Sequence, residues 1–170
     1  QNPIESQGVY PLPEAQLDRF LFKFEVGYPS LEQEREIVAK QGSRFGMPRP
    51  EQWGVAQVAD HATISAAADA VAANRLADEV VDYVVRLVRA TRATGDLQIG
   101  ASPRAGATLA AAARAHAALD GRDFVLPDDV KKLAPAALRH RVILSPAAEI
   151  DGRTADAVIA GLVEQVEAPR

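Results

Sequence analysis

The sequence predicts a mainly α-helical protein, a helical bundle with a short β ribbon that follows a short helix and a strand. Alanine is abundant from Ala56 onward, while aromatic residues make up only 5% of the 170 residues. This composition favours closely packed helices over sheets. Helix-starting and helix-ending signals also recur throughout the chain after residue 28. We therefore expect two parts, a leading part over residues 1–28 and a helical part over residues 29–170.

The leading part predicts a helix that leads into a strand. Pro13 suits the first turn of a helix, so Pro13–Arg19 is expected to form two short helical turns. Residues 20–26 then alternate with period two, and one face carries Phe20, Phe22, Phe24 and Val26. This alternation is typical of a half-buried strand. A single strand leaves its backbone groups unpaired, so we expect it to belong to a sheet whose other strands lie upstream.

Capping signals locate the helices of the second part. Ser30 and Gln33 form a capping-box pattern, and Ser102-Pro103 is an N-cap followed by proline at the first helical position. The expected helices run from Ser30 to Gly42, Thr63 to Asn74, Ala77 to Thr94, Ser102 to Gly121, from Pro127 onward, and from Thr154 to Val166.

Two further patterns concern packing and strands. The helix after Ala77 carries an apolar stripe made of Val81, Val84, Val85 and Val88. Two short β-type runs, Phe124–Val125 and Val142–Leu144, are expected to pair as the small ribbon.

The composition excludes several classes of protein. Hydrophobic residues make up 48% and charged residues 25% of the chain, as in ordinary globular domains. A net charge of −4 argues against a general nucleic-acid binder. The chain has no cysteine, which excludes disulfides and thiolate metal sites and fits a cytoplasmic protein. No apolar run reaches the ~18 residues that span a bilayer. Because the chain opens without Met, we expect a fragment.

Arg19 is the strongest candidate for a functional residue. It lies where the short helix meets the predicted strand, so its side chain is expected at the edge of a sheet-based domain. A guanidinium in this position can neutralise the charge that builds up on a transferring phosphoryl group. The alternative is an exposed arginine that pairs with Asp18 or Glu14, which contributes little.

Arg104 is the second candidate. A cation in the first turn of a helix opposes the helix dipole, whereas helix N-termini favour anions such as phosphate. Gly100 and Ala101 are expected to leave room for a ligand to approach the backbone closely. The alternative is an arginine that extends into solvent.

The remaining polar residues give weaker signals. Asn2 is a candidate polar residue at a strand end, or a turn former before proline. The three histidines, His61, His116 and His140, lie far apart without an i, i+4 pair, so no metal site is expected. The phosphate-binding pattern G-x-x-x-x-G-K-[ST] is absent, and no apolar run ends in acidic residues.

The segments Gln1–Glu5, Leu12–Phe20 and Gly100–Ala105 resemble, in order and spacing, the MoxR family of AAA+ ATPases. The resemblance covers nearly all of the chain, from the sensor-1 strand end to the C-terminus. It implies that Asn2 orients the attacking water as sensor 1, that Arg19 is an arginine finger, and that Arg104 is sensor 2 on an AAA+ lid. Residues 1–28 would then end the α/β nucleotide-binding core.

The resemblance also implies cofactors and partners. The parent protein would bind ATP and Mg²⁺, mainly through its missing N-terminal part, and assemble as a ring, usually a hexamer. Its clients would be proteins that it remodels or matures, including metal-cofactor insertion, often beside von Willebrand A domain proteins. The fragment alone is expected to be inactive as an ATPase. The alternatives are a non-catalytic helical adaptor or regulatory domain, and the lid of a related ring motor such as a magnesium-chelatase subunit or a replicative helicase.

Overall fold

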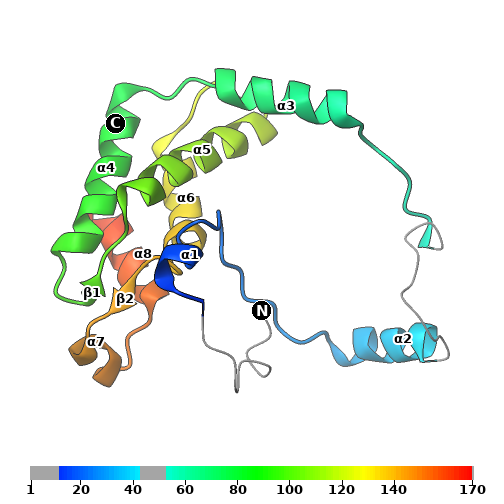
Figure 1. Cartoon of the computed structure of the whole chain (residues 1–170), viewed down its shortest axis with the longest axis horizontal. Coiled ribbons are helices and arrows are strands. Elements are labelled where there is room, and N and C mark those ends of the chain that lie inside the picture. Colours follow the sequence, from blue (N-terminus) through cyan, green and yellow to red (C-terminus); the bar gives the residue numbers. More distant parts are fainter. Residues whose placement is uncertain (1–11, 43–52, 170) are drawn as a thin grey trace. The chain divides into compact units, whose positions relative to one another are not determined.

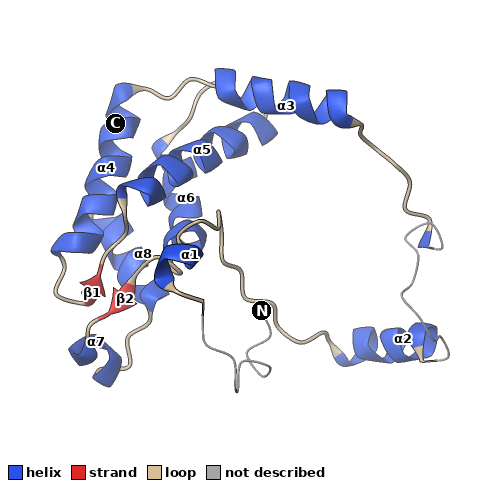
Figure 2. Ribbon diagram, in the orientation of Figure 1, coloured by secondary structure: helices blue, strands red, loops and turns tan. Residues whose placement is uncertain are grey.

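The computed structural model describes residues 12–42 and 53–169 (Figure 1). Within them helices dominate and a two-stranded ribbon is present, as Figure 2 shows. The helices are α1 Glu14–Leu17, α2 Leu31–Gln41, α3 His61–Ala73, α4 Asp78–Ala93, α5 Pro103–Leu119, α6 Pro127–Leu138, α7 Pro146–Ile150 and α8 Ala155–Gln165, and the strands are β1 Leu97–Ile99 and β2 Ile143–Leu144. None of these helices is long and apolar enough to cross a membrane. The predicted mainly helical fold is confirmed.

Contacts divide the chain into two compact units. One unit joins Gln1–Lys23 with Ala68–Arg170, and the other is Phe24–Ala67. The second unit contains α2, which begins at the predicted capping box: the Gln33 amide donates to the Ser30 hydroxyl, and the Ser30 amide donates to the Gln33 side chain. No residue of α2 is buried.

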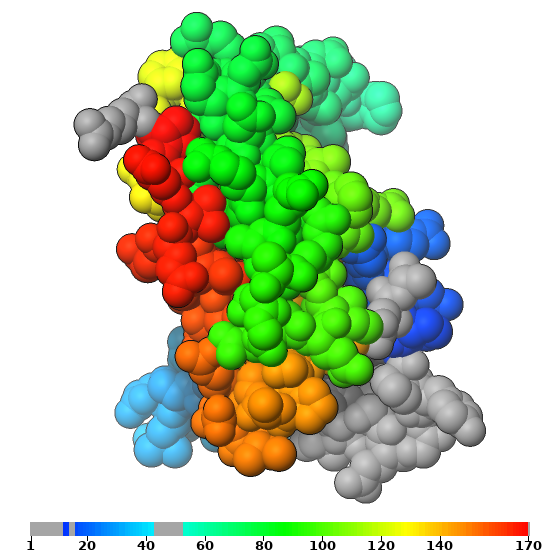
Figure 3. All heavy atoms as spheres, turned by 90° about the vertical axis from the view of Figure 1, so that its left-hand side faces the viewer, coloured from blue at the N-terminus to red at the C-terminus, as the bar shows by residue number. Residues whose placement is uncertain are grey.

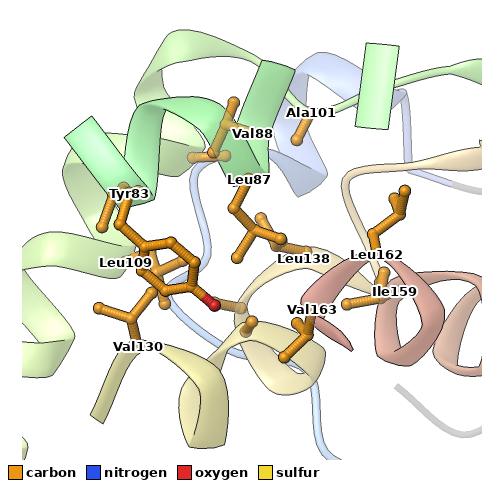
Figure 4. Packing of buried hydrophobic residues seen from close by; sticks show 14 of the residues in the cluster. Tyr83, Leu87, Val88, Ala101, Leu109, Val130, Leu138, Ile159, Leu162 and Val163 are labelled. Carbon is orange, nitrogen blue, oxygen red and sulfur yellow. The ribbon is translucent and has the colours of Figure 1, made fainter. Parts of the chain in front are cut away.

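The first unit contains the hydrophobic core, built from α4, α5, α6 and α8 (Figure 4). In Figure 3 the surface of α4, in green, runs beside that of α8, in red. The buried face of α4 is made of Val80, Tyr83, Val84, Leu87, Val88 and Thr91. The predicted stripe is therefore half right, because Val81 and Val85 are exposed. They lie one residue along the chain from buried positions, which turns them about 100° around the helix.

The ribbon differs from the prediction in its first strand. β2 lies where the sequence placed it, but it pairs antiparallel with β1, with Leu97 opposite Leu144. Phe124 instead forms an isolated parallel bridge with Arg75, in which the Val125 amide donates to the Arg75 carbonyl over 3.0 Å. Strand β1 has only three residues, so its sequence carries no clear alternation.

The strand predicted over residues 20–26 is wrong. These residues form no strand in the structure, and Phe20 and Phe24 are exposed, whereas Phe22 packs against the core. Residues 20–23 instead contact α6, where the Lys23 amide donates to the Ala136 carbonyl over 3.0 Å.

Gly100 lets the turn after β1 approach α4 closely. A Cβ at this position would lie 2.5 Å from the Thr91 carbonyl oxygen and 2.7 Å from the Arg92 amide nitrogen. The next residue uses this proximity, because the Ala101 amide donates to the buried Thr91 hydroxyl over 2.9 Å. The start of α5 is thus fixed against α4.

A buried carboxylate fixes the start of α6. Asp129 accepts two hydrogen bonds from Arg122, of 2.6 and 2.8 Å, and one of 2.8 Å from the Leu126 amide. Its carboxylate also lies 2.8 Å from Nδ1 of His116 on α5. Burial alone would raise the pKa of Asp129, but the hydrogen bonds outweigh burial and lower it from 3.8 to about 2.

We expect Gly100→Ala to destabilise the chain by about 1–3 kcal/mol, because the added methyl group meets backbone atoms that cannot rotate away. Gly161→Ala is the matched control, since a Cβ at Gly161 in α8 meets nothing within 4 Å. It should be neutral or stabilise the chain by up to ~1 kcal/mol through helix propensity. Urea unfolding of both variants measures this, and equal effects would contradict the close approach.

We expect the stability of the chain to fall at low pH because of Asp129. Its pKa is lower in the folded chain than in the unfolded one, so its contribution is fully present above about pH 4 and is lost as the pH falls to 2. That contribution is on the order of 2 kcal/mol. Asp129→Asn should remove most of the change in unfolding free energy between these pH values.

The control for this measurement is Asp128→Asn, on the neighbouring and exposed carboxylate. Its urea unfolding should follow the unsubstituted chain at pH 7 and at low pH. Equal acid sensitivity in all three chains would show that Asp129 is not the responsible group.

Candidate functional site

Of the three predicted site residues, Asn2 lies outside the described residues. Arg19 and Arg104 are both described, and both are exposed. Arg104 lies in the first turn of α5, behind the Ser102 N-cap, as predicted. No ion pair joins either arginine to another described side chain. Asp18, one of the two acids considered as a partner of Arg19, pairs with Arg141 instead.

Asp18, Ser102 and Arg141 form a polar cluster that we call the clamp. The Ser102 hydroxyl donates to both carboxylate oxygens of Asp18, over 3.1 and 3.2 Å. Nε of Arg141 lies 3.2 Å from the nearer of these oxygens. The Ser102 hydroxyl also caps α5 by accepting from the Ala105 amide. The clamp therefore joins the residue before Arg19 to the start of the helix that carries Arg104.

The Arg141 side chain also binds backbone carbonyls, and only 1% of it is exposed. It donates to the carbonyls of Asp18 over 3.0 Å and of Phe20 over 2.7 Å. It also donates to the carbonyl of Ala137 in the last turn of α6. Burial lowers the pKa of Arg141, and the Asp18 carboxylate opposes this effect. Arginine nevertheless remains a cation in proteins, so the clamp is a buried ion pair with full hydrogen bonding.

The neighbouring residue His140 adds to the same contact. Its Nε2 lies 2.9 Å from the Phe20 carbonyl, so this nitrogen carries the proton and donates. Burial lowers the pKa of His140, which favours the neutral ring. Arg139, His140 and Arg141 are consecutive basic residues just after α6. The three side chains separate, and Arg139 pairs with Asp156 of α8 over 2.9 Å.

An open groove of about 230 Å³ lies beside the clamp. Its lining is Asp18, Ile99, Gly100, Ser102, His140, Arg141 and Ile143. The sequence suggested that Gly100 and Ala101 leave room for a ligand at the backbone. The structure corrects this for Ala101, which is fully buried, and shows that the missing side chain of Gly100 makes room for α4.

The described residues contain one group with metal-ligand chemistry, formed by His116, Asp120 and Asp129. Arg122 already lies among these side chains, 2.6 Å from Asp129 and 3.1 Å from Asp120. A guanidinium in this position neutralises both carboxylates and repels a metal cation. The group therefore does not fit a metal ion, and its chemistry is that of a structural ion-pair network.

Sequence reasoning missed the clamp, although Asp18 and Ser102 belong to the segments that it singled out. Asp18 and Arg141 lie 123 positions apart in the chain, and no local pattern connects them. The one available signal was an arginine directly before the apolar run Val142-Ile143-Leu144, where a buried cation requires a partner.

Comparisons with known proteins show which families this chain is similar to. The sequence model of the AAA lid domain matches residues 89–162, and the model of the ATPase family associated with various cellular activities (AAA) matches residues 1–22. Chaperone MoxR1 of Mycobacterium tuberculosis is 44% identical over 179 residues, covering all of this chain and 46% of that protein. The uncharacterized protein YeaC of Bacillus subtilis is 40% identical over 169 residues, covering 99% of this chain and 51% of that protein.

A solved structure from Cytophaga hutchinsonii superposes on this chain with a TM-score of 0.84 at 30% identity. An ATPase function is provisionally assigned to that protein. The match covers all of this chain and 53% of that one. The chain thus spans about half the length of the relatives it matches. The lid-domain model matches residues 89–162, and the MoxR1 relative matches the whole sequence. The chain belongs to the MoxR family of AAA+ ATPases and contains the AAA lid domain of that family.

Proposed function

We propose that this chain is the C-terminal part of a MoxR-type ATPase, which couples ATP hydrolysis to the remodelling or maturation of partner proteins. Residues 1–28 end the nucleotide-binding core, and residues 29–170 form the lid. One observation carries the proposal: Arg19 and Arg104 are exposed cations without an ion-pair partner among the described side chains, and both adjoin the same clamp. Arg122 and Arg141, by contrast, use their charges within the fold.

Arg19 acts in this proposal as a finger on the nucleotide of a neighbouring subunit. Its guanidinium is available because Asp18 is occupied by Arg141 and Ser102. In the transition state of phosphoryl transfer, negative charge spreads over the γ-phosphoryl oxygens, and a cation placed there lowers the barrier. This role requires assembly into a ring, which we propose to be a hexamer.

Arg104 acts as the sensor that reports the nucleotide to the lid. It projects from the first turn of α5, where the free amides and the helix dipole already favour an anion. Ser102 and Pro103 fix the start of this helix, so the arginine is carried on a rigid element.

ATP and Mg²⁺ would be held mainly by residues that this chain does not contain. The sequence has no phosphate-binding loop, so the chain contributes arginines and, as we propose, Asn2 as the residue that orients water. The 170-residue chain alone is expected to show no ATP turnover. We propose that the clients are proteins, including von Willebrand A domain proteins, and that the complex works in the cytoplasm.

We expect Arg19→Ala, in a protein that also carries the nucleotide-binding half, to lower ATP turnover by about 10²- to 10³-fold while ATP affinity stays nearly unchanged. The reason is that a finger acts mainly on transition-state charge. Steady-state turnover and nucleotide titration measure the two effects. Arg89→Ala, on the exposed side of α4, is the control and should behave as the unsubstituted enzyme.

Mixing gives a second test of the finger. Arg19→Ala subunits should regain part of the turnover when they are mixed with subunits that have an inactive phosphate loop. In the mixed ring, the intact loop of an Arg19→Ala subunit can meet the intact Arg19 of its neighbour. Normal turnover of Arg19→Ala alone would disprove the finger role.

We expect Arg104→Ala to separate stability from activity. Removing a cation from the positive end of a helix should leave the stability of the 170-residue chain unchanged or raise it by ~0.3–1 kcal/mol. The same substitution in the longer protein should abolish most ATPase activity or ring assembly. Thermal unfolding and turnover are the measurements, and a large loss of stability in the short chain would instead make Arg104 a structural residue.

A further inference from the structure

We propose that Arg141 and Asp18 are positioning residues that hold Arg19 and Arg104 on one rigid body. When the lid of one subunit moves, the Arg19 of that subunit then moves with it, and this Arg19 acts on the nucleotide of the neighbouring subunit. This inference rests on the function proposed above. It assigns a role to two residues that touch neither nucleotide nor client in that proposal.

The clamp fixes Arg19 from both sides along the chain. The Arg141 guanidinium binds the carbonyl of Asp18, directly before Arg19, and the carbonyl of Phe20, directly after it. It also pairs with the Asp18 carboxylate. The backbone that carries the finger is therefore held on both flanks by one planar group, whose donors have a fixed geometry.

The same carboxylate holds the start of α5. Asp18 accepts both hydrogen bonds of the Ser102 hydroxyl, and Ser102 caps the helix two residues before Arg104. Only two side-chain contacts thus connect the backbone around Arg19 with the start of the helix that carries Arg104. The charge of Arg104 is close enough to lower the pKa of Arg141, which agrees with this short path.

Burial makes the clamp stiff. The Arg141 side chain is 1% exposed, so detaching residues 18–20 would leave a buried cation without its partners. Such an unpaired charge is strongly unfavourable, and a loose intermediate position is therefore poorly populated. The clamp transmits a movement of the lid to Arg19 instead of absorbing it.

His140 and Ala136 extend the contact along α6 and the residues just after it. Nε2 of His140 donates to the Phe20 carbonyl, and the Lys23 amide donates to the Ala136 carbonyl. Residues 18–23 therefore follow a surface that belongs to the lid helices. These backbone contacts do not depend on the Asp18 charge, so Asp18→Asn weakens the clamp without removing the docking.

The first experiment measures the position of Arg19 in the 170-residue chain. The chain has no cysteine, so nitroxide labels can be placed at Arg19→Cys and Leu119→Cys without other changes. Leu119 is exposed at the far end of α5, a helix of 17 residues that is about 25 Å long, which suits a dipolar distance measurement. We expect a narrow distance distribution.

Asp18→Asn and Arg141→Met should each broaden that distribution about twofold or more. Arg139→Met is the control, because Arg139 lies two residues away and pairs with Asp156 of α8, not with residues 18–20. It should leave the distribution narrow. A narrow distribution in both Asp18→Asn and Arg141→Met would overturn the proposal, and if Arg141→Met does not fold, Asp18→Asn decides it alone.

The second experiment measures turnover in the protein that also carries the nucleotide-binding half. Small displacements of a catalytic group cost about 10- to 100-fold in rate, so Asp18→Asn should lower kcat by about that factor and leave the ATP affinity unchanged. Arg139→Met should keep normal turnover. A residue that only stabilises the fold would lower the melting temperature without this selective loss of kcat.

The outcomes distinguish the two proposals. If Arg19→Ala abolishes turnover but Asp18→Asn keeps it, the clamp has no positioning role, although the proposed function stands. If Arg19→Ala and Arg104→Ala both keep normal turnover, the proposed function fails and the coupling inference fails with it. Broad label distances together with a selective loss of kcat in Asp18→Asn support the coupling.

Discussion

The structure depends on the burial of one cation, the guanidinium of Arg141. A charge removed from water must be paired and hydrogen-bonded, and here the chain meets that requirement with the Asp18 carboxylate and backbone carbonyls from both ends of the sequence. Residues 18–23 are drawn onto the lid for this reason, although they have few apolar contacts of their own. Of the two phenylalanines in this segment, Phe22 packs against the core and Phe20 is exposed.

A second ionic network, around Asp129, serves a different purpose. Its members lie within α5, α6 and the turn between them, so it stabilises local geometry without joining distant segments. The two networks differ in how far apart in the sequence their members lie. The Asp129 network spans 13 residues, from His116 to Asp129, whereas the clamp spans 123, and only the second can link the start of the chain to the lid.

The sequence predicted the elements whose signals are local. Capping residues such as Ser30, Ser102 and Thr154 placed helix starts within one or two residues, because a cap is decided by three or four neighbouring positions. Arg19 and Arg104 were found as candidates from short motifs. The strand predicted for residues 20–26, the partner of β2 and the clamp all depend on contacts between distant segments. Period-two alternation describes side chains, but a strand also needs a neighbour for its backbone.

The small residues of α5 explain how these parts are held with so little aromatic packing. Ala105, Ala113 and Ala117 are fully buried, and Gly106 lies against the valines of α4. Small side chains let helices approach closely, and α5 packs against both α4 and α6. A rigid α5 gives the clamp a firm base. The same helix carries Arg104 in its first turn, which places an exposed cation on a capped and packed helix.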